Sequence, residues 1–263
     1  MVIKPQSEHA AKRRMPCQLA SLWCTLFGVM TFALAIATPD GDDHFAVLVF
    51  SKTAGFRHDS IPAGIAALKS LGAQHRFTVD VTEASTTFTD DALTRYRVVV
   101  FLNTSGPILN TEQHAAFERF IRRGGGFVGI HSAADTEYNW PWYERLVGAY
   151  FKDHPAIQPA VLKVVDASHW STKHLPTTWS RTDEWYNFRS EPSTDGNVLL
   201  RIDESSYTGG TMGASHAISW CHLYEGGRAW YTALGHTIES YSEPLFLQHL
   251  WGGIAWAADM PHE

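Results

Sequence analysis

Apolar runs of strand length alternate with helical patterns in the first half of the chain, and this alternation limits the fold more than any other feature. Residues 45–50 read FAVLVF, a continuous apolar run typical of a parallel strand that is covered on both faces. Further strands are predicted at residues 77–81, 97–102 and 127–130. Strands that alternate with helices through short connections predict a doubly wound α/β fold with a mostly parallel sheet flanked by helices.

The helices between these strands carry recognisable start and stop signals. Residues 61–71 have apolar side chains at helical spacing and run into Gly72. Thr89 is suited to cap a short helix over residues 90–96, and Asn110 is suited to cap the next one, which ends near residues 122–124.

The second half of the chain consists mainly of predicted strands. Strands are predicted at residues 161–165, 198–202, 217–221 and 229–234, with a closing helix at residues 244–258. These strands either extend the sheet or add a β layer against one edge. The pattern predicts one domain over residues 45–258, because no low-complexity linker or repeat divides it.

Residues 1–37 have the pattern of a secretory signal peptide. A basic segment at residues 12–14 precedes a mostly apolar run, and Ala35-Ile36-Ala37 fits a small-x-small cleavage pattern. Cleavage near Ala37 predicts an exported protein, periplasmic or extracellular, without a stable membrane span. The alternative is an uncleaved signal anchor.

Charge and cysteine content limit the partners of the remaining chain. Removing residues 1–37 leaves 17 Lys and Arg against 26 Asp and Glu, so nucleic acid is not an expected partner. Cys221 is the one cysteine left, which excludes an intramolecular disulfide in the processed chain. The oligomeric state stays open.

Polar residues that can bind metals or transfer protons recur at predicted strand ends and in loops. They are His58, His131, Asp135, His154, Asp183, Glu184, His216 and His236. Residues 125–135 (GGFVGIHSAAD) have the frame of a strand-to-helix elbow, in which His131 takes the place usual for a nucleophile. A lone histidine is most often structural, but several at one edge of a sheet indicate a site.

Imidazoles and carboxylates serve both as zinc ligands and as acids and bases near neutral pH. We therefore assign catalytic roles to His131, His154 and Glu184. The same three residues with His236 are the candidate ligands of a divalent metal such as zinc. Since the chain has neither HExxH nor CxxC, such a site would be assembled from distant loops, and the presence of a metal stays open.

Aromatic residues add a candidate sugar-binding face. Seven of the ten tryptophans lie after residue 150. Trp140, Trp142 and Trp185 are candidate stacking walls for a carbohydrate ligand, although core packing explains many tryptophans. The remaining candidate substrate contacts are His58, Asp135, His216 and His236.

Four segments in order resemble the ThuA-like (trehalose utilisation) domain family. They are residues 125–135 (GGFVGIHSAAD), 142–155 (WYERLVGAYFKDHP), 183–188 (DEWYNF) and 226–237 (GGRAWYTALGHT). The resemblance implies a fold similar to class I glutamine amidotransferases, with the catalytic cysteine replaced by His131, and a link to disaccharides and their keto forms. Where the family pattern is expected to have His-Pro, this chain has His216-Ala217.

Three functions stay open at this point. The first is an exported enzyme that processes a glycoside, disaccharide or keto-sugar by acid/base or metal-assisted chemistry, and is not an amidotransferase. The second is a noncatalytic carbohydrate-binding domain, and the third is a structural or interaction domain. Only the enzyme needs titratable groups within hydrogen-bond reach of one substrate atom.

Overall fold

The computed structural model describes residues 44–192 and 197–261 of the 263-residue chain. The expected leader at residues 1–37 lies outside the described residues. Among the helices that are described, none combines the length and the apolar character needed to cross a bilayer.

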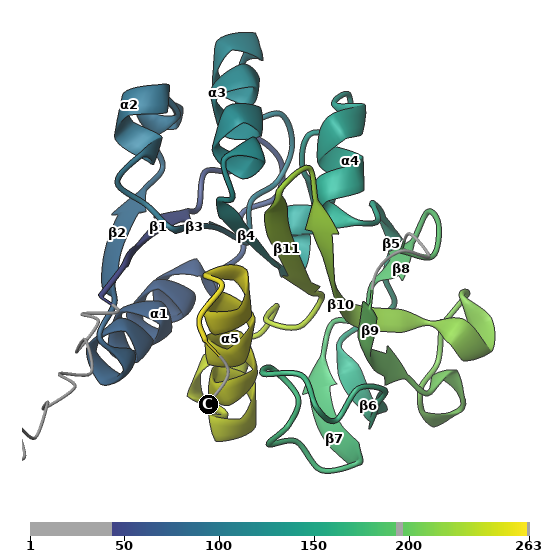
Figure 1. The fold of residues 1–263 in the computed structure, drawn as a ribbon. Coiled ribbons are helices and arrows are strands. Elements are labelled where there is room, and N and C mark those ends of the chain that lie inside the picture. Colours follow the sequence, from purple (N-terminus) through teal and green to yellow (C-terminus); the bar gives the residue numbers. More distant parts are fainter. Residues whose placement is uncertain (1–43, 193–196, 262–263) are drawn as a thin grey trace, which may run out of the picture. The chain divides into compact units, whose positions relative to one another are not determined.

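A nine-stranded sheet forms the centre of the fold, in the order β2-β1-β3-β4-β11-β10-β9-β6-β7 (Figure 1). Its strands are β1 (Ala46–Phe50), β2 (Thr78–Thr82), β3 (Val98–Leu102), β4 (Gly126–Ile130), β6 (Gln158–Val164), β7 (Thr178–Asp183), β9 (Asn197–Ile202), β10 (Ala217–Tyr224) and β11 (Gly227–Thr232). The five strands from β2 to β11 are parallel, and the four that follow are antiparallel. The second half of the chain therefore extends the same sheet.

Five helices lie on the two faces of the parallel strands. They are α1 (Ile61–His75), α2 (Asp90–Leu93), α3 (Thr111–Arg122), α4 (Pro141–Val147) and α5 (Pro244–Ala257). Figure 1 shows α2, α3 and α4 on one face and α1 with α5 on the other. A separate two-stranded sheet pairs β5 (Phe151–Asp153) with β8 (Asn187–Phe188). The predicted doubly wound α/β fold with extra strands in the second half is confirmed.

Burial and capping explain why the elements form where they do. Every residue of β3 and β4 is buried, as expected for parallel strands covered by helices on both faces. The Thr89 hydroxyl accepts the Ala92 N–H at 3.2 Å and caps α2. Asn110 and Gln113 form a reciprocal capping box at the start of α3, and this satisfies two otherwise unpaired N–H groups.

Strand β7 has no counterpart among the predicted strands. Its buried side chains alternate with exposed ones, but two of the three buried residues are Arg181 and Asp183. A pattern of alternating apolar residues does not reveal such a strand, because its inward face is partly charged.

Helix α5 packs closely against β11 through a glycine. A Cβ atom added at Gly253 would lie 2.5 Å from the indole ring of Trp230, which is fully buried. A contact this short requires the ring or the helix to move.

Replacing Gly253 with alanine should lower the free energy of unfolding by about 1 kcal/mol. Alanine favours the helix by up to ~1 kcal/mol over glycine, but overpacking of a dense core costs ~1–3 kcal/mol. Urea unfolding followed by tryptophan fluorescence measures the difference. Gln248→Ala, at an exposed position of the same helix, is the control and should change stability little. A Gly253→Ala protein at least as stable as the parent would contradict this account of the packing.

Candidate functional site

The loops after three parallel strands bring three histidines together. His58 lies in the loop after β1, His131 directly follows β4, and His236 lies four residues beyond the end of β11. Their ring centroids are 4.9 to 5.0 Å apart. The carboxyl ends of parallel strands meet at one edge of the sheet, which is where ligand sites of such folds form.

His131 occupies a strained backbone position at the end of β4. Its φ angle is +50°, in the left-handed region that residues with a Cβ atom rarely adopt. Two hydrogen bonds hold it there. The His131 Nδ1 donates to the Ala233 carbonyl at 2.7 Å, and the Tyr231 hydroxyl donates to the His131 carbonyl at 2.8 Å. Because the Ala233 carbonyl engages Nδ1, Nε2 is the ring nitrogen that faces the Glu184 carboxylate.

The carboxylate of Glu184 lies at the centre of the histidines. Its Oε2 is 3.0 Å from Nδ1 of His236 and 3.4 Å from Nε2 of His131. Its Oε1 is 3.0 Å from Nδ1 of His154. Burial favours the neutral acid, but the imidazoles of His131 and His236 outweigh it and hold the pKa of Glu184 below its usual range. The group is therefore an ionised carboxylate.

Asp183 fixes the backbone around this carboxylate. It is completely buried, and its oxygens accept the backbone N–H groups of Glu184 at 3.0 Å, Gly235 at 2.9 Å and His236 at 3.1 Å. The guanidinium of Arg181 lies 3.1 Å from the same carboxylate and balances its charge. One buried side chain thus positions two residues of the site that are far apart in sequence.

Four ligand atoms form a compact group. The donor atoms of His58, His131, Glu184 and His236 all lie within 4.8 Å of one another. Zinc–nitrogen bonds of about 2.0–2.1 Å in a tetrahedron place neighbouring donors ~3.3 Å apart. The three separations among His131, Glu184 and His236 are 3.0 to 3.4 Å. Three of the four donors therefore have the spacing that a divalent metal of the zinc class requires, and the His58 donor lies within 4.8 Å of them.

The protonation state of His58 fits the same role. Burial, followed by its neighbours His131 and His236, lowers the pKa of His58 to about 2. It is therefore neutral, as a metal ligand must be. Its Nδ1 lies 3.3 Å from the hydroxyl of Ser132, which orients the ring as outer partners of metal ligands do.

A pocket of about 380 Å³ opens beside the four donor atoms. It is lined by Phe56, His58, Asp135, Phe151, His154, Glu184, Tyr186 and His236. The Tyr138 hydroxyl donates to Asp135 at 2.6 Å, and burial raises the pKa of that carboxyl despite this bond. The volume lies within the ~300–1,000 Å³ range of small-molecule sites.

A family model described as trehalose utilisation (ThuA) matches residues 46–257, which span almost all of the described domain. The chain belongs to the ThuA family.

Solved structures agree with this assignment. A protein described as ThuA-like from Bacteroides uniformis has 25% sequence identity and a TM-score of 0.71, with 81% of this chain and 91% of that chain covered. A second, from Parabacteroides merdae, has 21% identity and a TM-score of 0.70, over 83% and 92%. A protein described as a GMP synthase subunit from Thermoplasma acidophilum shares the fold, with 12% identity and a TM-score of 0.51 over 81% and 94%. No curated protein matches this chain.

This ThuA-family chain has no thiol at the elbow within its described residues. Cys221 is the one cysteine among them and lies buried in β10, far along the sequence from His131. Burial raises the pKa of the Cys221 thiol to about 12, so it is a poor nucleophile. The described residues therefore offer no cysteine for amidotransferase chemistry.

The structure brings together most of the residues that the sequence analysis singled out. His58, Asp135, His154, Glu184 and His236 line the pocket, and the fully buried His131 contacts Glu184 and His236 from behind.

The candidate ligand set of this ThuA-family chain differs from the sequence-derived set by one histidine. His58, expected as a substrate contact, is one of the four compact donors. His154 is not: its side chain is 43% exposed and reaches Glu184 through Oε1 only. His154 therefore lies where it can meet a ligand in the pocket.

The three tryptophans expected to stack on a sugar do not line this pocket. Trp140 and Trp142 are buried on and beside α4, where their indole N–H groups donate to Glu118 at 3.2 Å and Glu225 at 2.8 Å. Trp185 is completely buried. All three tryptophans pack in the core instead. Buried indole rings stabilise the fold wherever their N–H group finds a hydrogen-bond partner.

His216 is also outside the pocket. It is fully buried, its Nδ1 lies 2.8 Å from the Glu204 carboxylate, and its Nε2 donates to the Tyr186 carbonyl at 2.8 Å. Both ring nitrogens are engaged in this structural role, so no nitrogen is left for a substrate.

Three aromatic residues of the pocket were not among the sequence candidates. Phe56, Phe151 and Tyr186 form its walls, and the Tyr186 ring lies 4.2 Å from that of His131. Each lies two or three residues along the sequence from a candidate histidine or glutamate. This closeness in sequence is the signal by which they could have been predicted as pocket residues.

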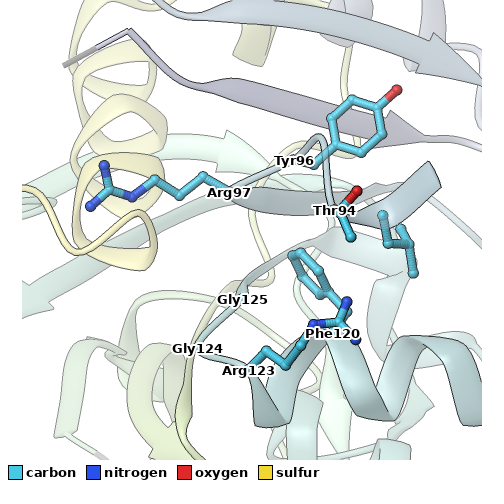
Figure 2. A pocket seen from close by; sticks show the side chains of 8 residues that line it. Thr94, Tyr96, Arg97, Phe120, Arg123, Gly124 and Gly125 are labelled. Carbon is cyan, nitrogen blue, oxygen red and sulfur yellow. The ribbon is translucent and has the colours of Figure 1, made fainter. Parts of the chain in front are cut away.

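A cavity of similar volume, about 360 Å³, lies at the opposite edge of the sheet (Figure 2). Its lining includes Arg97 and Gly125, which directly precede β3 and β4. Figure 2 shows Arg97 and Arg123 extending in different directions. Arg97 reaches the Asp259 carbonyl at 3.4 Å, and Arg123 pairs with Asp90 at 3.4 Å. These cations do not converge on one point, so this cavity lacks the chemistry of the histidine site.

Replacing Asp183 with asparagine should lower the free energy of unfolding by about 3 kcal/mol, since the buried charge of Arg181 then loses its buried partner and retains the partly exposed Glu243 at 3.3 Å. Thermal and urea unfolding measure the loss. Asp90→Asn, which breaks an exposed pair with Arg119, is the matched control and should have a far smaller effect. Equal effects of the two changes would show that the buried pair does not organise this region.

Proposed function

We propose that this protein is an enzyme that acts on a disaccharide or another glycoside, or on its keto form, with the help of a divalent metal of the zinc class. The observation that carries the proposal is the compact group of three imidazoles and one carboxylate at the wall of a ligand-sized pocket. Membership of the ThuA family, described as trehalose utilisation, supports a carbohydrate-related role.

The placement of the donor atoms favours a bound cation. The Nε2 of His131 lies 3.4 Å from the Glu184 Oε2 and 3.1 Å from the His236 Nδ1. When both imidazoles are neutral and present lone pairs to the carboxylate, a cation among these atoms removes their mutual repulsion. His58, His131, Glu184 and His236 would hold the metal.

A metal of this class supplies Lewis-acid polarisation of a carbonyl and a lowered pKa for a bound water. The residues of the pocket supply the remaining functions. His154 is half-exposed on the pocket wall and can give or accept a proton at a substrate oxygen. Asp135 is a second proton-transfer group, because burial raises its pKa above the usual value. Phe56, Phe151 and Tyr186 bind the ring and limit access of water.

A noncatalytic carbohydrate-binding domain is the second candidate function. The aromatic walls of the pocket favour it, since stacking on such rings binds sugars without any chemistry. The two functions differ in whether the titratable groups are needed.

Removing one of the four proposed ligands should lower zinc affinity by at least ~100-fold, more than the loss of an outer partner costs. We expect this of His58→Ala and of Glu184→Gln. His154→Ala should keep the affinity of the parent, as should His75→Ala, a control on the stacked histidine of α1. Competition with a zinc chelator, with elemental analysis of the purified protein, measures the affinities. If His154→Ala loses zinc while His58→Ala keeps it, the ligand set of the sequence analysis is the correct one.

His154→Ala should reduce turnover by at least ~100-fold, the usual effect of losing a general acid or base, while zinc binding is unchanged. The substrates are neutral disaccharides and their 3-keto derivatives, assayed with and without chelator. The Lys163→Ala variant, whose charge lies on β6, is a control and should keep full turnover. A parent protein that binds these sugars but turns none of them over is instead a carbohydrate-binding domain.

A further inference from the structure

A second cavity adjoins the pocket of the histidine site. Its volume is about 220 Å³, and it shares Phe56, His58 and His236 with that pocket. The rest of its lining is Asp59, Ser60, Ile157, Thr237, Ile238 and Glu239. Three side chains therefore line both spaces, which makes the two cavities direct neighbours.

Exposed apolar side chains gather at this second cavity. Among the described residues, five large hydrophobic side chains are exposed, and three of them line it: Phe56 at 65%, Ile157 at 48% and Ile238 at 52%. Single exposed apolar residues are ordinary, but a cluster beside a pocket marks a binding surface. The Phe56 ring meets the His58 ring edge to face at 4.8 Å, and both residues line both cavities.

Two carboxylates complete the lining. Asp59 and Glu239 are both exposed at the cavity, and within the described part of the chain neither forms an ion pair. Carboxylate oxygens accept hydrogen bonds from hydroxyl groups. They also repel a phosphate or a carboxylate on a ligand.

Apolar faces together with hydroxyl-binding oxygens are what a pyranose ring needs, since its C–H faces are apolar and its edge carries hydroxyl groups. We propose that the second cavity is a subsite for the second ring of a neutral glycoside, whose first ring lies in the pocket beside Glu184 and His154. This rests on the proposed carbohydrate function. The subsite selects disaccharides over monosaccharides and uncharged rings over phosphorylated or acidic ones.

The first test is binding of sugars to the full-length protein, measured by calorimetry. The probes are trehalose, maltose, cellobiose, sucrose and lactose, with methyl α-glucoside as the single-ring reference. At least one disaccharide should bind ~10-fold or more tightly than the reference, a difference of about 1.4 kcal/mol. Ile157→Ser with Ile238→Ser should remove that advantage and leave binding of methyl α-glucoside unchanged.

The matched control is Val165→Ser with Leu223→Ser, which changes two exposed aliphatic residues elsewhere on the molecule. It should leave every affinity as in the parent. The proposal is overturned if no disaccharide binds better than the single ring, or if the two double variants behave alike. Zinc content, measured on the same samples, reports separately on the proposed metal function, because neither isoleucine belongs to the four-donor group.

The second test addresses charge selection. The parent should bind the 6-phosphate of its preferred disaccharide more weakly than the disaccharide itself. Asp59→Asn with Glu239→Gln removes both charges and should reduce the ratio of the two dissociation constants by at least ~3-fold, with a larger effect at low ionic strength. An unchanged ratio would overturn the assignment of these carboxylates to the subsite.

Discussion

The buried carboxylate of Asp183 is the interaction on which the histidine site depends. Strand β7 lies at one end of the sheet order and β11 lies near its centre, yet the site needs a glutamate that follows the first and a histidine that follows the second. Asp183 joins them by accepting N–H groups from Glu184, Gly235 and His236. Such a carboxylate is tolerable in the interior because Arg181 is buried beside it.

His131 shows how a strained turn at the end of a strand presents a side chain to the edge of the sheet. The left-handed backbone at this position costs of order 1–3 kcal/mol, and the surrounding hydrogen bonds to Ala233 and from Tyr231 hold it in place. In a nucleophile elbow the same strain exposes a reactive oxygen or sulfur. Here it directs an imidazole nitrogen toward Glu184. The backbone geometry of a nucleophile elbow thus also serves to present an imidazole.

The sequence predicted the sheet and the edge where the site lies, because apolar runs and caps are local signals. Asn110 and Thr89 cap helices as expected. What could not be predicted depends on pairing between distant segments. Strand β7 was missed because Arg181 and Asp183 take inward positions that apolar residues usually occupy. The exchange of His154 for His58 in the donor group follows from loop geometry, which residue type alone does not encode.

The proposed metal would engage the four donor groups differently from a bound proton. A proton on Nδ1 of His236 satisfies the contacts with Glu184 at 3.0 Å and with His131 at 3.1 Å, but it does not engage His58. His58 remains neutral, because its burial and the adjacent histidines resist any further positive charge. A divalent cation would instead be held by all four donors, and the single carboxylate would leave it one net positive charge. That charge would face a pocket of ligand size, where it would supply polarisation of an oxygen on the proposed sugar substrate.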